Sequence, residues 1–276
     1  MNYFNFISMP IIEIKMYNLP HILILLFFPT LAILSYFLFK GKSEKSKLIF
    51  IWSIFIFTFV ITYSTYIVSL ITNYNNTRTN FFSELPLHMC SINVLFYPIF
   101  FALRNKFPKW LSSTTFAYMY FLGSMGAFVA MVVTAPYDCV GEGVNLLRYN
   151  VLSYWLKHGF IFITPFIYVA LGFYRPRFKD IFKGIAFYIC LLMIMEYFNL
   201  VSTQLNYKIG STAVSNYFYA ATGEGTAVLE IVWKWIPIEF VYLLPFSVIA
   251  VPIFFLLYLP FGIVDLINKN KKNKVV

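Results

Sequence analysis

Side chains capable of nucleophilic and acid–base chemistry occur at similar positions in three apolar stretches of the chain. His88 and Cys90 lie near the start of one stretch, His158 lies in a second, and Glu196 in a third. A free thiol is mostly protonated at neutral pH, and a neighbouring base converts it into the thiolate nucleophile. Glu196 could orient an imidazole as the third member of a triad does. These residues predict cysteine-dependent catalysis with His88 or His158 as the base.

The spacing of polar residues after Cys90 indicates which side of its helix faces inward. Cys90, Asn93 and Tyr97 are three and four residues apart, so they share one face of a helix, whereas His88 and Cys90 do not. His158 from another helix is then the better base for Cys90. Pro86 at the first turn could make that turn irregular and restore the nearer His88. Asn93 or backbone amides would stabilise an oxyanion.

The composition requires that these residues sit in a membrane protein. The 276 residues are 60% hydrophobic and 12% charged, with a mean hydropathy of +0.74, whereas soluble domains carry about 25% charged residues. The net charge of +10 comes from 21 Lys and Arg in short clusters between apolar runs, which serve membrane topology. The expected partners are therefore membrane lipids, and no nucleic acid is expected.

Apolar segments long enough to cross a bilayer define the expected architecture. A spanning helix needs roughly 20 mostly apolar residues, because every backbone group must be satisfied within the segment. The sequence predicts an all-α, polytopic membrane protein, one membrane domain over residues 1–276 with seven transmembrane helices. The predicted spans are approximately 21–39, 48–71, 85–103, 111–134, 151–173, 181–203 and 238–264. The stretch at 227–237 suits a helix on the membrane surface.

Basic residues concentrate in alternate connections, which predicts the orientation. The segments 40–47, 104–110, 174–183 and the C-terminal tail hold most of the Lys and Arg, and such segments stay in the cytoplasm. The N-terminus is therefore expected outside and the C-terminus in the cytoplasm of a multi-pass protein of the cell membrane. The catalytic candidates then lie roughly 5–12 Å below the outer ends of their helices at 1.5 Å per residue. The sequence predicts a polar cavity open to the outer leaflet, where phospholipid ester groups lie.

The hexapeptide from Leu85 to Cys90, Leu-Pro-Leu-His-Met-Cys, resembles the LPxHxC signature of the YwaF-type bacterial membrane family, which includes vertebrate transmembrane protein 164. Asn216 and Tyr217 resemble a second family motif, and His158 also resembles a family position. The resemblance implies a cysteine-dependent phospholipid acyltransferase or acyl hydrolase in a bacterial plasma membrane, with the nucleophile at Cys90. Four further residues are expected to contact the substrate: Tyr97, Asn199, Asn216 and Tyr217.

Other interpretations remain open. Cys90 could be a packing residue, or could form a disulfide with Cys139. The whole protein could instead be a small-molecule transporter or membrane binding component in which His88, His158 and Glu196 line a path, or a subunit without chemistry of its own. The proposed acyl transfer needs no metal and no organic cofactor. The group Asp138, Cys139 and Glu142 lacks a recognisable metal-ligand spacing.

Overall fold

The computed structural model describes residues 11–72, 81–83, 85–133, 139–223 and 227–273. Within these ranges the regular secondary structure is helical, apart from one isolated bridge between Glu13 and Asn145. The predicted all-α fold is thus confirmed.

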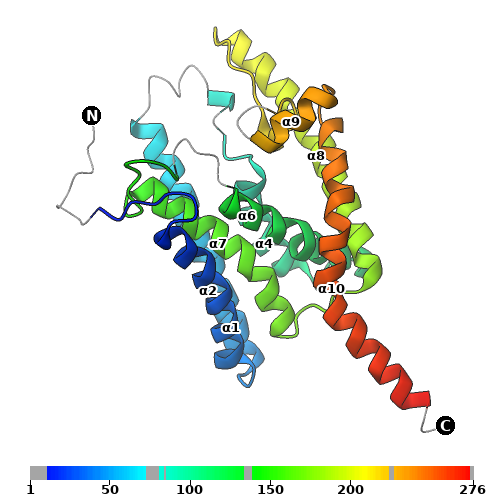
Figure 1. The fold of residues 1–276 in the computed structure, drawn as a ribbon. Helices are drawn as coiled ribbons and strands as arrows, with labels where there is room; N and C mark the ends of the chain where they lie inside the picture. The colour runs from blue at the N-terminus through cyan, green and yellow to red at the C-terminus, as the bar shows by residue number, and fades with distance from the viewer. Residues whose placement is uncertain (1–10, 73–80, 84, 134–138, 224–226, 274–276) are drawn as a thin grey trace.

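The helices follow one another along the chain as Figure 1 shows. The longer ones are α1 (Leu19–Phe39), α2 (Glu44–Thr72), α4 (Met89–Leu103), α5 (Lys109–Ala117), α6 (Ser124–Val132), α7 (Tyr149–Ala170), α8 (Phe178–Lys208), α9 (Ala227–Trp235) and α10 (Leu244–Asn273). A π-helical segment η2 (Tyr118–Gly123) joins α5 to α6, and single 3₁₀ turns occur at η1 (Phe81–Ser83), η3 (Tyr217–Tyr219) and η4 (Val241–Leu243).

Five helical segments within the described ranges are long and apolar enough to cross a membrane. They are Leu19–Phe39, Glu44–Val68, Lys109–Val132, Phe178–Lys208 and Val241–Asn268. The predicted windows 85–103 and 151–173 also coincide with helices, α4 and α7. Helix α4 is short for a span at 15 residues, and α7 is less apolar because it carries Lys157 and His158.

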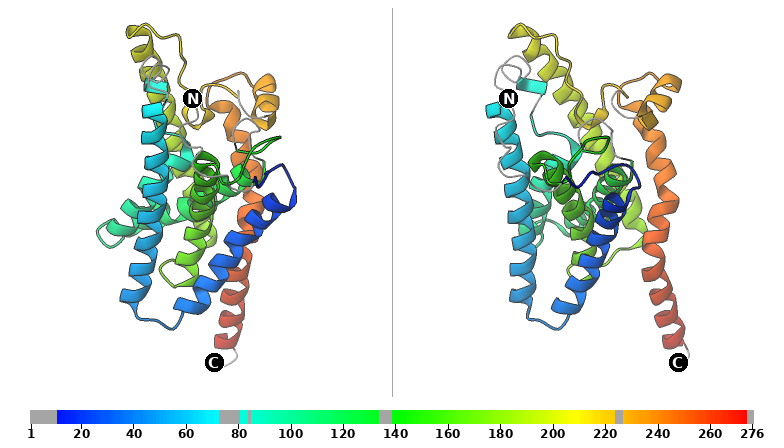
Figure 2. Two further views of the ribbon diagram at one scale, coloured as in Figure 1. Left: turned by 90° about the vertical axis from the view of Figure 1, so that its left-hand side faces the viewer. Right: turned by 60° about the vertical axis from the view of Figure 1, so that its left-hand side comes forward.

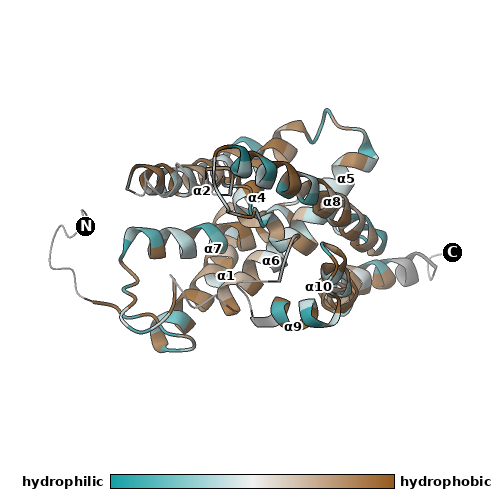
Figure 3. Cartoon of the chain, turned by 90° about the horizontal axis from the view of Figure 1, so that it is seen from above, coloured by the Kyte–Doolittle hydropathy of each residue, from teal (hydrophilic) through white to brown (hydrophobic). Residues whose placement is uncertain are grey.

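The less apolar α7 occupies a central position in the bundle. It packs against α1, α2, α4 and α6, and seen from above α6 and α7 lie toward the middle of the molecule (Figure 3). Helices α1, α2 and α10 expose Leu, Ile and Phe side chains instead. The polar groups of α7 are therefore shielded by neighbouring helices, whereas the peripheral helices present apolar surfaces suited to lipid.

The two ends of the bundle differ. The connection between α1 and α2 and the C-terminal end of α10 lie at one end, and α9 lies at the other (Figure 2). The segment before α1 pairs with the loop before α7: Ile14 N donates to Val144 O (2.9 Å), and Gly141 N donates to Ile14 O (3.0 Å). This pairing covers the start of α7 at the end opposite the α1–α2 connection.

An ionic contact reinforces this pairing outside the spans. Gly143 N donates to the Glu13 carboxylate at 2.7 Å, and Lys15 Nζ lies 3.3 Å from the same side chain. The hydrogen bond from Gly143, assisted by the charge of Lys15, holds the pKa of Glu13 below its usual value. Gly143 has a φ of +71°, a conformation that a residue with a side chain rarely adopts.

Candidate functional site

The start of α4 differs from the prediction. Residues 85–88 were expected to be helical, but α4 begins at Met89 with His88 as its extended N-cap. Pro86 disfavours a helical conformation of the preceding residue, and the hydroxyl of Tyr217 holds this segment in place: it accepts from Leu85 N at 3.0 Å and donates to Phe82 O at 2.5 Å. The first turn is thus irregular, which was the alternative that Pro86 suggested.

Residues 216–222, which we call the 216–222 loop, are fixed by two asparagines. Asn199 on α8 accepts from Tyr217 N (2.7 Å) and donates to Tyr217 O (3.1 Å). Asn216 accepts from the backbone N–H groups of Ala221 and Thr222 (both 3.1 Å) and donates to Thr222 O (3.0 Å). Both amide side chains are consumed in holding Tyr217 and the loop, so the structure places them behind Tyr217.

The 216–222 loop meets the segment that precedes α4. The ring of His88 lies 5.6 Å from the ring of Tyr217 and 5.8 Å from that of Tyr219, measured between centroids. Tyr219, whose φ is +55°, also interacts electrostatically with Cys90. The hexapeptide 85–90 and the pair Asn216-Tyr217, more than 120 residues apart in sequence, therefore form one structural unit.

Cys90 is a half-buried free thiol in the first turn of α4. Its electrostatic neighbours include Lys157 on α7, and Lys157 also interacts with Cys139. Cys139 is likewise a free thiol in this structure, and its carbonyl accepts from Trp155 Nε1 at 3.3 Å. The structure thus contains no Cys90–Cys139 disulfide, and a cation lies near both sulfurs.

His158 is buried on α7 beside Tyr154. Its Nδ1 lies 2.7 Å from Tyr154 O, and its ring centroid is 4.1 Å from that of Tyr154. A carbonyl only accepts hydrogen bonds, so in the neutral ring Nδ1 carries the proton and Nε2 keeps its lone pair. That is the tautomer a general base requires. Among the described residues no hydrogen bond joins this ring to Cys90.

Glu196 occupies a different part of the site. One oxygen of its carboxylate accepts from Asn199 Nδ2 at 3.4 Å. The carboxylate also lies within electrostatic range of Glu239. Its other oxygen is buried and has no partner in the described chain. Glu196 thus belongs with Asn199 and the 216–222 loop. The position that Glu196 was expected to fill, orienting His158, is filled by the carbonyl of Tyr154.

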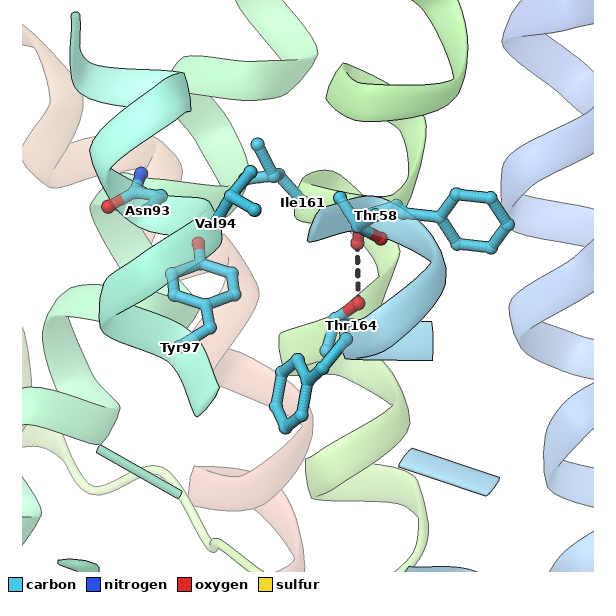
Figure 4. A pocket seen from close by; sticks show the side chains of 8 residues that line it. Thr58, Asn93, Val94, Tyr97, Ile161 and Thr164 are labelled. Atoms are coloured by element: carbon cyan, nitrogen blue, oxygen red, sulfur yellow. Dashed lines mark hydrogen bonds between the residues drawn. The ribbon is translucent and has the colours of Figure 1, made fainter. Parts of the chain in front are cut away.

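Asn93 and Tyr97 line a small cavity between α2, α4 and α7 (Figure 4). Asn93 is fully buried: its Oδ1 accepts from the Tyr118 hydroxyl at 2.8 Å, and its Nδ2 has no partner in the described part of the structure. Tyr97 donates to Met119 O at 3.3 Å. The hydrogen bond drawn in Figure 4 runs from Thr164 Oγ1 to Phe160 O (2.5 Å). The cavity, at about 10 Å³, has room for about one water molecule.

Lys157 is the site residue that sequence reasoning missed. It lies in none of the basic connections, and its charge is close enough to act electrostatically on His88, Cys90 and His158. The available signal was its place in the predicted span 151–173, next to His158, where an ionisable group is costly and indicates function. We call His88, Cys90, Asn93, Lys157 and His158 the thiol site.

Metal ligation has no support in the ranges that the structure describes, which contain no group of three or more His, Cys, Asp or Glu placed to hold an ion. Asp138, which was considered as a metal ligand together with Cys139 and Glu142, lies outside the described residues.

Apolar peripheral helices, a polar central helix and a polar site inside the bundle define a multi-pass helical membrane protein. The chain matches the TMEM164 family over residues 16–258, which include the thiol site and the 216–222 loop. The protein therefore belongs to the TMEM164 family, as its resemblance to vertebrate transmembrane protein 164 indicated. No curated protein and no solved structure matches the chain significantly.

Proposed function

We propose that this protein is a membrane-embedded, cysteine-dependent acyltransferase or acyl hydrolase that acts on phospholipids. The observation that carries the proposal is the position of the free Cys90 thiol, which lies in the first turn of α4 beside Lys157 and Tyr219. Helix N-termini favour negative charge, and a neighbouring base can convert a thiol in this position into the thiolate nucleophile. The proposal includes membership of the YwaF-type bacterial branch and a place in the plasma membrane.

The proposed topology has seven spans, with α4 and α7 added to the five long apolar segments. The α1–α2 connection and the end of α10 lie at one end of the bundle and carry basic residues, which supports a cytoplasmic location for that end. The N-terminus would then be outside. The thiol site would open toward the outer leaflet.

In the proposed reaction, Cys90 Sγ attacks the carbonyl carbon of a lipid ester as His158 Nε2 or His88 accepts the thiol proton. The tetrahedral intermediate collapses with cleavage of the ester C–O bond, and the imidazolium returns the proton to the departing lysolipid oxygen. An acyl thioester remains on Cys90. The hydroxyl of a second lipid, or water, then attacks it and gives its proton to the same base, which restores the thiol.

The geometry supports specific roles for the surrounding side chains. His158 Nε2 is in the basic tautomer, and catalytic hydrogen bonds often tighten only once substrate is bound. Asn93, one turn after Cys90, has a free Nδ2 donor suited to an oxyanion. Tyr97 and Tyr217 would contact the substrate. Asn199 and Asn216 would act by positioning Tyr217. Glu196 would act by accepting a hydrogen bond from Asn199.

Mass spectrometry of the purified protein after incubation with phospholipid vesicles tests the proposal. We expect an acyl adduct on Cys90 that hydroxylamine removes, and its loss in Cys90→Ala. Cys190→Ala is the matched control, because Cys190 is an exposed free thiol on α8 and should leave the adduct intact. An unmodified thiol with unchanged lipids would overturn the proposal and favour the transporter or binding component.

A further inference from the structure

We propose that Lys157, together with the uncapped N-terminus of α4, forms a binding subsite for the phosphate group of the lipid substrate. This inference rests on the proposed phospholipid chemistry and deepens it. It assigns a role to the one ionisable residue of the thiol site that the reaction above does not use.

Helical spacing places Lys157 opposite Cys90. Phe160 and Ile161, three and four residues after Lys157 on α7, line the same cavity as Asn93 and Val94, three and four residues after Cys90 on α4. Lys157 and Cys90 therefore both lie one turn before this shared cavity on two packed helices. The electrostatic interaction between the two side chains agrees with this placement.

Lys157 has no carboxylate partner among the residues that the structure describes. Its side chain is largely buried, and among the described residues it forms no salt bridge, unlike Lys15 and Lys183. A buried cation without a counterion costs several kcal/mol, and ionisable groups at membrane depth usually mark a ligand path. The missing counter-charge is most simply supplied by an anionic ligand.

The first turn of α4 provides neutral donors beside this cation. Its N-cap, His88, makes no side-chain capping bond, and the backbone N–H groups of Met89, Cys90 and Ser91 find no acceptor among the described residues. Free N–H groups at a helix start bind phosphate oxygens. The buried, unpartnered Nδ2 of Asn93 lies one turn further along the same helix and leaves another donor unused.

A phosphate diester fits this position chemically. The phosphate of a glycerophospholipid lies a few bonds from its acyl ester carbonyls, so a phosphate held by Lys157 and the start of α4 would bring an ester close to Cys90 Sγ. Lys157 would thus select phosphate-bearing lipids over diacylglycerols, which have the same esters without the charge.

Protection of the Cys90 thiol from alkylation tests the subsite without requiring turnover. In a Cys139→Ser, Cys190→Ser background Cys90 is the sole thiol, and its rate of reaction with N-ethylmaleimide reports occupancy. The probes are dihexanoylphosphatidylglycerol, dihexanoylglycerol and inorganic phosphate. The variants are Lys157→Met, Lys157→Arg and, as a matched charge control, Lys234→Met, since Lys234 is exposed on α9.

We expect the phosphatidylglycerol to protect Cys90 in the parent, in Lys157→Arg and in Lys234→Met. In Lys157→Met the half-protecting concentration should rise about tenfold or more, as for loss of one charge-assisted hydrogen bond. Dihexanoylglycerol should protect poorly throughout. Protection by inorganic phosphate as strong as that by the lipid, and dependent on Lys157, would also support the subsite but assign it to soluble phosphate.

Equal protection of the parent and Lys157→Met, or equal protection by both lipids, would overturn the proposal. If Cys90 does not react with the reagent, native mass spectrometry of bound phosphatidylglycerol in the parent, Lys157→Met and Lys157→Arg decides the same question. Retention of lipid in Lys157→Met would then refute the subsite. Lys157-dependent protection without an acyl adduct would refute the proposed catalysis while leaving the subsite standing.

Discussion

The 216–222 loop and the thiol site are neighbours that differ in how their asparagine side chains are hydrogen-bonded. Asn199 on α8 and Asn216 in the loop each hydrogen-bond backbone groups of the loop through both the oxygen and the nitrogen of the side-chain amide. In the thiol site, Asn93 Nδ2 has no partner in the described structure and Lys157 has no counterion there. Buried polar groups that are hydrogen-bonded stabilise one conformation. Buried polar groups without a partner lower stability and are available to bind a ligand. This difference distinguishes a structural framework, the 216–222 loop with Asn199, from the thiol site, where we propose that the reaction takes place.

The largest effect should come from His158, one of the two histidines of the thiol site. His158→Gln should reduce the rate of acyl-adduct formation on Cys90 by about 10²–10⁴-fold, the usual contribution of a general base. Intact-protein mass spectrometry over a time course measures this rate. His21→Gln is the matched control, because the ring nitrogens of His21 already contact Tyr17 N (2.8 Å) and Met131 O (2.9 Å). A similar loss of rate in His158→Gln and His21→Gln would mean that replacing His158 slows the reaction by disturbing the fold.

A second experiment contrasts the two asparagines directly. Asn199→Ala leaves the N–H and C=O of Tyr217 unpaired, so it should lower the free energy of unfolding by about 1–3 kcal/mol. Asn93→Leu removes an unsatisfied amide and deprives only the Tyr118 hydroxyl of its acceptor, so it should cost about 1 kcal/mol or less. Denaturation in detergent measures both. The reverse order would contradict the division into framework and reactive site.

Close packing beside the thiol site gives a third contrast. A methyl group added at Gly123 would overlap the Tyr97 hydroxyl, whereas the same change at Gly41 meets nothing within 4 Å. Gly123→Ala should therefore destabilise the protein by about 1–3 kcal/mol. Gly41→Ala should stay within about 0.5 kcal/mol of the parent. Thermal unfolding of the two variants measures the difference, and equal midpoints would show that Tyr97 moves freely.

The smallest effect concerns the ionic contact before α1. Because the pKa of Glu13 is lowered in the folded protein, its ionised form stabilises the pairing at neutral pH, and this contribution is lost as pH falls through the range in which Glu13 is protonated. Hydrogen exchange at the Gly143 amide should therefore accelerate on acidification beyond its intrinsic pH dependence. Glu13→Gln should remove this extra acceleration. An unchanged profile in that variant would rule out the carboxylate as its cause.

Helical periodicity and hydropathy were sufficient to predict the helices but not the details of their ends. The predicted window 85–103 includes His88, whose backbone is extended. Pro86 indicated that this turn could be irregular, but not the tertiary contact that fixes it: Tyr217 holds Phe82 and Leu85 from more than 130 residues away. The window 111–134 likewise gave no indication of the π-helical segment within it. Local patterns carry no information about such long-range contacts.

The sequence was sufficient to predict most residues of the candidate site, but not which of them contact one another. His88 and Tyr217 were both identified from the sequence, and the structure brings their rings together. Glu196 was expected to orient His158, but membrane depth alone cannot say which helices are neighbours, and Glu196 lies beside Asn199 instead. Lys157 was overlooked because a single cation in an apolar window was read as a topological charge.

The π-helical segment Tyr118–Gly123 makes the register of this helix a determinant of the thiol site. A π turn contains one more residue than an α turn, so the same six residues wound as a regular α-helix would leave the segments on its two sides in a different register. In that regular helix, everything on one side of the segment would be rotated by about 100° relative to its present position. The Tyr118 hydroxyl and the Met119 carbonyl could then no longer both face Asn93 and Tyr97.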